Sequence, residues 1–480
     1  MKAWHAIGLT LLALCVLQAL LVSPLLPLFL AAALVVLLLS LRFPVVLAVG
    51  AFAIGLMPHA YMIAWGFPVI GINFLDLAVL LMFVVVVARW SEVRAALSTE
   101  SLLRILVVFV FAAGVVALAH GQLEGFGTRT ALRSFRFYFH LLITFYFAAL
   151  LARPSQQKIV VSAWMILVLV QLFLVGANGI TYSPDDPGTL LLAPDIYWTS
   201  AHFLPLKTFY PALIALAILA VAGRQQPVLL TAGLWSLVAL EFTVLAFTYK
   251  RSQYVGLTSG LLAVGLGALF VEFHRSRRFT AVLVRWLGVL FLLVVATGAV
   301  FQLALRTVPA DAEQVQENLL RRALFLKQAD SDAPIQDRLE GLRAGWNNIR
   351  DNPVFGTGLG DSVTYVRAQI FHSGWMWVAV SAGLPAALML LLLVGLAGAR
   401  TLRTLATNSE DTLASALRLG FFACLAALAG NALSWGSTLD IGDVSDWGLL
   451  LGLLAVTVPR PSPKKASEVR LEEPATAVSR

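Results

Sequence analysis

Residues 105–119 of this sequence read ILVVFVFAAGVVALA and lie between Arg104 and His120. A helix of this composition, extended by about a turn at each end, crosses the roughly 30 Å of hydrocarbon in a bilayer. Similar apolar runs recur from the first ten residues to the last forty, and 59% of the 480 residues are apolar while 12% are charged. One water-soluble core cannot bury that much apolar surface, so the sequence predicts a chain that crosses a membrane many times.

We expect an all-α polytopic membrane protein with about fourteen transmembrane helices and one large extracytoplasmic loop that contains amphipathic helices. Eleven of the helices fall in residues 1–305, the loop occupies 306–371, three more helices follow in 372–458, and 459–480 form a disordered cytoplasmic tail. The expected spans are 7–22, 25–41, 44–58, 69–88, 103–120, 137–152, 158–178, 205–222, 228–248, 253–271, 281–305, 373–399, 414–433 and 444–458.

The basic residues indicate the orientation. With the N-terminus in the cytoplasm, most Lys and Arg residues fall in short cytoplasmic loops, which accounts for the formal charge of +8 without any nucleic-acid partner. The loops 181–202 and 434–443 then lie outside and are acidic or neutral. Cys15 and Cys424 both lie in apolar runs, which argues against disulfides and metal ligation. We therefore expect a multi-pass membrane protein with both termini in the cytoplasm.

Three segments on the predicted outer side are basic, against this charge bias. After the span 103–120, three arginines recur at spacings of four and three residues, which places them on one face of a helix. They are Arg129, Arg133 and Arg136. Lys250 and Arg251 form a basic turn between two spans, and the loop 306–371 is the third segment. These arginines either contact lipid headgroups or bind an anionic substrate, and the sequence leaves both possibilities open.

The loop 306–371 contains an amphipathic pattern that ends at a proline. Apolar residues recur every three or four positions at Ile335, Leu339, Leu342, Trp346 and Ile349. This pattern predicts a helix with one face apolar enough to lie on the membrane, and Pro353 should end it. Gly356, Gly358 and Gly360 then predict a flexible turn, and His372 stands at the mouth of the next span.

Fork-shaped guanidinium groups outside the membrane match a diphosphate best, and lipid-linked sugars carry a diphosphate there. Transfer of a glycan from such a donor needs a base for the acceptor hydroxyl and cations for the departing diphosphate. His372 is our candidate base, with Arg251 and Arg338 as its catalytic partners. Lys250 and the arginines at 129, 133 and 136 are candidate diphosphate ligands. Because no acidic cluster stands beside these residues, we expect neither a metal nor an organic cofactor.

The same residues resemble a known family. Arg338, the stretch Asn352–Gly360 (NPVFGTGLG) and the pair His372-Ser373 are similar, in order and spacing, to the Arg, Pro-x-x-Gly-x-Gly and His-Asn/Ser elements of the O-antigen ligase and Wzy-type polysaccharide polymerase superfamily. Residues 248–252 (TYKRS) resemble the family's Ser-Arg-Gly turn. The motifs extend over roughly residues 200–432, and the hydropathy resembles that of the family over the whole chain.

The resemblance implies a polytopic glycosyltransferase of a bacterial inner membrane, with its active site at the periplasmic face. It implies that the enzyme acts on an undecaprenyl-diphosphate glycan, with a lipid or a glycan as acceptor. It implies that His372 activates the acceptor while Arg251 and Arg338 engage the donor diphosphate. Ser252 and Ser373 stand where the family commonly has Gly and Asn, so ligase and polymerase both remain open. A transporter or flippase of lipid-linked saccharides is the alternative, although we find neither an inverted repeat nor a buried charged pair in the sequence. A non-catalytic envelope scaffold would not need His372.

Overall fold

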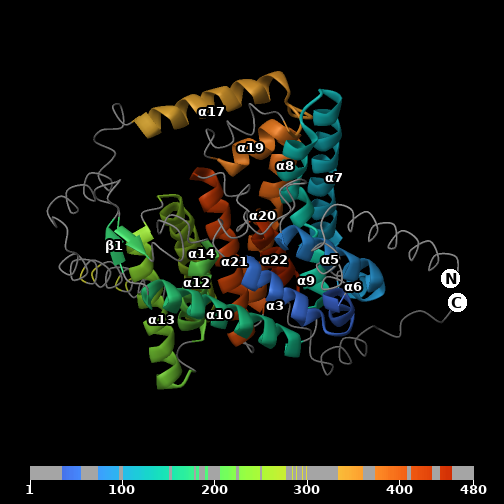
Figure 1. The fold of residues 1–480 in the computed structure, drawn as a ribbon. Helices are drawn as coiled ribbons and strands as arrows, with labels where there is room; N and C mark the ends of the chain where they lie inside the picture. Colours follow the sequence, from blue (N-terminus) through green and yellow to red (C-terminus); the bar gives the residue numbers. More distant parts are fainter. Residues whose placement is uncertain are drawn as a thin grey trace, which may run out of the picture.

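The structure is a computed structural model of the chain. It describes residues 35–55, 74–96, 101–150, 154–177, 180–182, 190–192, 206–222, 226–248, 251–276, 333–360, 373–407, 412–434 and 444–456, with single positions at 284, 288, 295 and 299. The expected span 7–22, most of 25–41 and of 281–305, the first part of the predicted loop and the C-terminal tail lie outside the described residues. The described part is helical apart from one small sheet (Figure 1).

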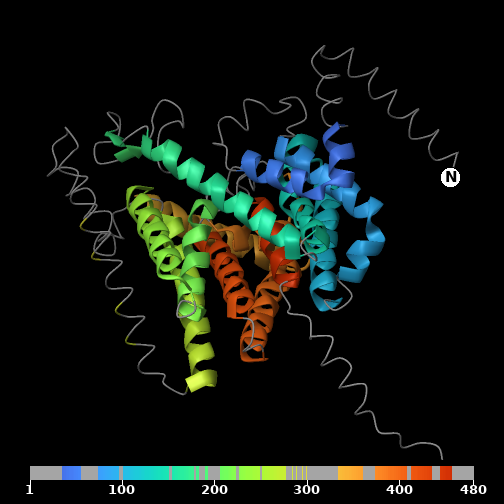
Figure 2. The ribbon, with the colours of Figure 1, turned by 90° about the horizontal axis from the view of Figure 1, so that it is seen from below.

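The N-terminal half contains seven labelled helices. They are α3 (Pro44–Gly55), α5 (Phe74–Ala88), α6 (Trp90–Ala96), α7 (Ser101–Leu123), α8 (Thr128–His140), α9 (Ile143–Leu150) and α10 (Pro154–Ala177). In Figure 2, α10 runs diagonally from the side of the small sheet to the group formed by α3 to α9. It contacts α3 and the short 3-10 helix η2 (Leu206–Phe209), so it joins the two halves of the described chain.

The C-terminal half supplies the centre of the bundle. Its helices are α12 (Tyr210–Val221), α13 (Val228–Thr248), α14 (Arg251–Ser276), α17 (Ala333–Asp351), α19 (Gly374–Ala382), α20 (Leu384–Thr407), α21 (Thr412–Ser434) and α22 (Val444–Val456). Helix α21 packs against α12, α14, α20 and α22. The contact with α14 is close because a Cβ atom at Gly260 would lie 3.0 Å from the Ala423 carbonyl oxygen. Small residues allow this approach of two helix backbones in a membrane.

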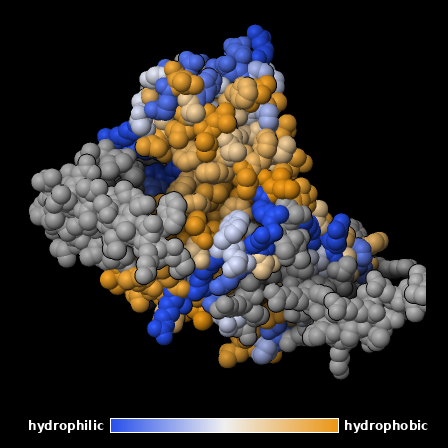
Figure 3. All heavy atoms as spheres, turned by 90° about the vertical axis from the view of Figure 1, so that its right-hand side faces the viewer, coloured by the Kyte–Doolittle hydropathy of each residue, from blue (hydrophilic) through white to orange (hydrophobic). Residues whose placement is uncertain are grey.

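Five of the described helices are long and apolar enough to cross a membrane. They contain the segments Leu102–Leu123, Val228–Leu245, Gln253–His274, Leu384–Ala406 and Thr412–Leu433. Helix α7 exposes Ile105, Val108 and Phe109, and Figure 3 shows apolar residues spread over the same side of the molecule beneath a more hydrophilic cap. The predicted polytopic membrane protein is confirmed at this level, while the number of fourteen spans stays a prediction.

Two expected spans are interrupted, so their prediction as single helices was wrong. Within 137–152, a turn at Leu141 and Leu142 separates α8 from α9, because hydrogen bonds such as Thr144 N–H to Leu141 C=O (3.1 Å) join residues three apart and tighten the chain. Within 373–399, Gly383 has a φ of 86° and separates α19 from α20. A residue in this conformation cannot continue a right-handed helix.

The all-α prediction misses a small antiparallel sheet in the predicted outer loop 181–202. Strand β1 (Ile180–Tyr182) pairs with β2 (Leu190–Leu192), with Thr181 opposite Leu191. The β-branched and aromatic residues of β1 favour an extended chain, but a three-residue strand is too short to show a periodic pattern in the sequence.

Candidate functional site at one end of the bundle

Helix α17 lies across one end of the bundle, above α19 (Figure 1). It confirms the predicted amphipathic helix and ends at Asp351, just before Asn352 and Pro353. Leu339, Leu342 and Trp346 are exposed, and Trp346 retains 61% of its accessible surface, whereas Ile349 is buried. The backbone of Arg338 belongs to this helix. One of the candidate catalytic residues therefore lies on an element that caps the bundle.

The glycine segment after α17 is held rigidly, which corrects the expected flexible turn. Gly356, Gly358 and Gly360 all have positive φ values, of 68°, 87° and 101°. The Thr357 N–H donates to the Val380 carbonyl (2.8 Å), and the next N–H donates to the carbonyl of Ser381 (3.1 Å). The segment therefore attaches α17 to the C-terminal end of α19. Glycine is needed here for backbone conformation and close contact rather than for flexibility.

The same segment also packs against α7 and α8. The Leu359 N–H donates to the Ala117 carbonyl of α7 (2.9 Å), and a Cβ atom at Gly360 would lie 2.7 Å from the Cβ atom of Ala131 in α8. Ala131 lies between Arg129, which is exposed, and Arg133, which is partly buried. Two of the three arginines predicted as diphosphate ligands therefore stand on a helix that touches the Pro-x-x-Gly-x-Gly turn.

Arg136, the third arginine of that face, is paired. Its Nε and Nη2 atoms donate to the two carboxylate oxygens of Asp76 in α5, at 2.6 and 2.7 Å. His140 Nε2 lies 3.0 Å from the same carboxylate, and its side chain is fully buried. A bidentate pair of this kind fixes both side chains. Arg136 thus links α8 to α5 inside the protein, and its role as a diphosphate ligand stays a prediction.

A second group of elements meets at the C-terminal end of α21. Ser373, the residue after His372, donates a hydrogen bond from Oγ to the Ala432 carbonyl (3.4 Å), and Trp375 Nε1 donates to the Ala429 carbonyl (2.9 Å). On the same turns of α21, a Cβ atom at Gly256 would lie 3.0 Å from the Cβ atom of Asn431. The second turn of α14 and the first turn of α19 therefore flank one helix end.

Only some of the predicted site residues lie in the part of the chain that the structure describes. Arg251 is the first residue of α14, whose positive N-terminal end favours an anion nearby. His372 and Lys250 lie outside the described residues, and of Arg251 and Arg338 only the backbone is described. Helix α19 spans nine residues, about 13 Å, between this junction and the glycine turn. The elements that carry or adjoin all the candidate catalytic positions thus gather at one end of the bundle.

Asn431 is a candidate site residue that the sequence reasoning missed. Its side chain is 1% exposed, and neither Oδ1 nor Nδ2 has a hydrogen-bond partner among the described residues. Burying an unsatisfied amide costs free energy, so such a group is commonly kept for a reason. The available signal was a single Asn in the otherwise apolar stretch 419–433, which is unusual inside a membrane segment.

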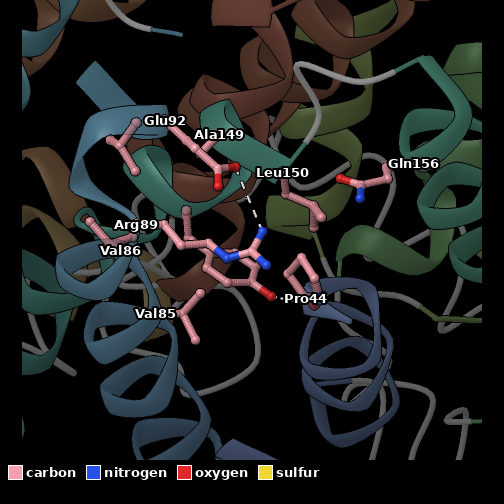
Figure 4. Close-up of a pocket in the computed structure, with 10 residues that line it drawn as sticks. Pro44, Val85, Val86, Arg89, Glu92, Ala149, Leu150 and Gln156 are labelled. Atoms are coloured by element: carbon pink, nitrogen blue, oxygen red, sulfur yellow. Dashed lines mark hydrogen bonds and ion pairs between the residues drawn. The ribbon is translucent and has the colours of Figure 1, made fainter. Parts of the chain in front are cut away.

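The described chain has two other polar features. A pocket of about 330 Å³, open to solvent, is lined by Arg89, Glu92, Tyr146 and Gln156 among others (Figure 4). It lies at the Ala88 end of α5, about 20 Å along the helix from Asp76. Lys207 Nζ and Asp446 Oδ1 are 3.4 Å apart, and both side chains are buried. The expectation of no buried charged pair was therefore wrong, because the partners are far apart in the sequence.

The fold and this end of the bundle define an α-helical membrane protein whose cap helix is locked onto the bundle by a glycine-rich turn. Residues 236–391 match the model of a family described as O-antigen ligase. The match includes α14, α17, α19, the glycine turn and position 372, and it confirms the resemblance stated above. Through this region the chain is similar to the O-antigen ligase and Wzy-type superfamily. No curated protein matches the chain.

Proposed function

We propose that this protein transfers a glycan from an undecaprenyl-diphosphate donor to a hydroxyl of a lipid or glycan acceptor at the periplasmic face of a bacterial inner membrane. The observation that carries the proposal is the family match over residues 236–391, which contains Arg251, Arg338 and His372. The convergence of α14, α17 and α19 at one end of the bundle supports it. Arg129 and Arg133 on α8 add positive charge beside the glycine turn.

In the proposed reaction, the acceptor oxygen attacks the anomeric carbon of the donor sugar. The new bond forms as the bond between that carbon and the diphosphate oxygen breaks, and the hydroxyl proton passes to the imidazole of His372. The leaving undecaprenyl diphosphate carries the displaced electron pair, and Arg251 and Arg338 stabilise its charge. Lys250, Arg129 and Arg133 hold the diphosphate in place. These groups carry the proposed reaction without a metal or an organic cofactor.

A transfer assay with purified protein tests this proposal. Undecaprenyl-diphosphate oligosaccharide and candidate acceptors are supplied to the wild type, His372→Ala, Arg251→Ala and Arg338→Ala. We expect each variant to lose at least a hundredfold in rate. Its thermal unfolding should change little, because we expect these residues to lie at the wet outer surface. His274→Ala and Arg343→Ala are matched controls, because both residues are exposed and lie outside the proposed machinery. Normal turnover by His372→Ala would contradict the assignment of the base.

The buried pair Lys207–Asp446 supports the alternative of a transporter or flippase, because polar groups inside a membrane bundle often mark a transport path. Reconstitution into liposomes separates the two functions. Movement of a lipid-linked saccharide across the bilayer, with no glycan transfer to any acceptor supplied, would favour transport. Transfer with no movement across the bilayer would favour the glycosyltransferase.

A further inference from the structure

Helix α17 carries a strip of exposed apolar side chains, formed by Leu339, Leu342 and Trp346. With about 3.6 residues per turn, these three side chains lie within about 60° of one another around the helix. Val354 and Phe355 follow the helix, and because both are exposed they extend the apolar surface to the glycine turn. Contiguous apolar surface of this kind is typical of a contact with another molecule or with a membrane.

The apolar strip lies between a side of α17 that packs on the protein and a side that is polar. Gly341, Gly345 and Ile349 are buried, and helical geometry places them about 90° from the centre of the strip. Glu340 and Asn347 are exposed and lie about 110–130° from that centre in the other direction. A helix that packs on a protein at the boundary between lipid and water needs its sides in this order.

Two hydrogen bonds fix the level of α17 relative to the candidate membrane spans. The Pro353 carbonyl accepts the N–H of Leu384 (2.8 Å), and Leu384 is the first residue of the span in α20. The Leu359 N–H donates to the Ala117 carbonyl (2.9 Å) of α7. The span in α7 ends at Leu123, six residues or about 9 Å beyond Ala117. The C-terminal end of α17 therefore lies at the level where two spans end.

Helix α17 also has the direction of a helix that lies along a membrane surface. In Figure 1 it runs across the end of the bundle, whereas α7 runs toward that end. The hydrocarbon of a bilayer meets its headgroups at the ends of the spans. An exposed apolar strip at this level is in contact with acyl chains, while the polar side of the same helix stays in water.

We propose that α17 is an interfacial helix that inserts Leu339, Leu342 and Trp346 into the lipid leaflet at this end of the bundle. The partner of the strip is the bilayer itself, through its acyl chains just below the headgroups. Tryptophan suits this level because its ring is apolar and its N–H donates a hydrogen bond. The contact would hold the glycine turn and the neighbouring helix ends at the level of the headgroups. The proposal does not depend on the proposed glycan transfer.

Nitroxide spin labels on single cysteines test the proposal in the full-length protein, reconstituted in nanodiscs of phosphatidylethanolamine and phosphatidylglycerol. The background has Cys15 and Cys424 replaced. Power saturation measures how often each label collides with oxygen, which dissolves in the hydrocarbon, and with a nickel chelate, which stays in water. The ratio of the two collision rates reports whether a label lies in lipid or in water.

Leu342→Cys and Trp346→Cys place the label on the apolar strip. Glu340→Cys and Asn347→Cys are matched controls, because both positions are exposed on the polar side of the same helix. Leu391→Cys, at an exposed position within the span of α20, gives the reference value for lipid. We expect the ratio of oxygen to nickel collisions to be at least roughly threefold higher on the strip than at the two controls.

Two results would overturn the proposal. Equal ratios on the strip and at the controls would show that α17 stands in water above the membrane. Loss of collisions with both reagents on the strip would show that protein, not lipid, covers it. Thermal unfolding of each labelled variant checks that it is folded, and either strip position alone decides the outcome if the other variant does not fold.

Discussion

At the scale of single residues, buried polar groups divide into those that hold helices together and those that have no partner in the described chain. Asp76 belongs to the first class, because one carboxylate binds both Arg136 and His140. Asn431 belongs to the second, because its amide lies buried without a hydrogen bond among the described residues. Removing one partner from a group of the first class should destabilise the protein. Replacing a group of the second class with an apolar residue should stabilise it.

Asp76→Asn should destabilise the protein by about 3–5 kcal/mol, because it leaves the largely buried guanidinium of Arg136 without a countercharge. The measurement is the free energy of unfolding in detergent, from denaturant titration. Glu92→Gln is the control, since Glu92 is half exposed and its ion pair with Arg89 is 3.6 Å long. Exposed pairs contribute about 0–1 kcal/mol. An Asp76→Asn variant as stable as Glu92→Gln would refute the structural role of the pair.

Asn431→Leu should raise stability by about 1–3 kcal/mol, because it removes a buried amide that has no hydrogen bond among the described residues. If the amide serves the proposed reaction, the same variant should lose glycan transfer by at least tenfold. Unfolding and transfer are measured on the same preparation. A stabilised variant with full transfer would show that Asn431 has no part in the reaction.

At the scale of elements, the glycine turn decides how α17 is attached. Gly383 illustrates this, because a Cβ atom there would lie 2.0 Å from the Val354 carbonyl oxygen and its φ is 86°. Backbone atoms cannot move aside as a flexible side chain does. The turn and the break between α19 and α20 therefore depend on each other.

Gly383→Ala should destabilise the protein by about 2–4 kcal/mol, because it combines a backbone clash with a strained φ. Gly395→Ala in α20 is the control. No heavy atom lies within 4 Å of a Cβ atom at that position, so the change should stabilise the helix by about 0.5–1 kcal/mol. Both are measured by thermal unfolding. Equal unfolding temperatures for the two variants would contradict the packing of the turn.

At the scale of the whole molecule, the distribution of charge and apolar surface sets the orientation in the membrane. The end with α17 and the α7–α8 turn should face the periplasm, and α6 together with the connection between α20 and α21 should face the cytoplasm. This orientation underlies the proposed reaction.

Single cysteines test the orientation in a background in which Cys15 and Cys424 are replaced. Thr128→Cys, at the exposed start of α8, should react with a membrane-impermeant maleimide in intact cells whose outer membrane has been made permeable. Arg94→Cys should react only after the inner membrane is opened. Labelling of Arg94→Cys in intact cells would invert the topology and place the candidate site in the cytoplasm.

The sequence by itself determined the membrane class, the amphipathic helix ending at Asp351, the helix α13 at 228–248 and the resemblance to the O-antigen ligase family. These follow from local patterns, because hydrophobic length, helical periodicity and ordered motifs are properties of neighbouring residues. Only the tertiary structure decided the partners of Asp76, the buried pair Lys207–Asp446, the rigid glycine turn and the burial of Asn431 without a hydrogen bond among the described residues. Each of these depends on two segments far apart in the chain meeting in a medium without water, where an unmet polar group is costly.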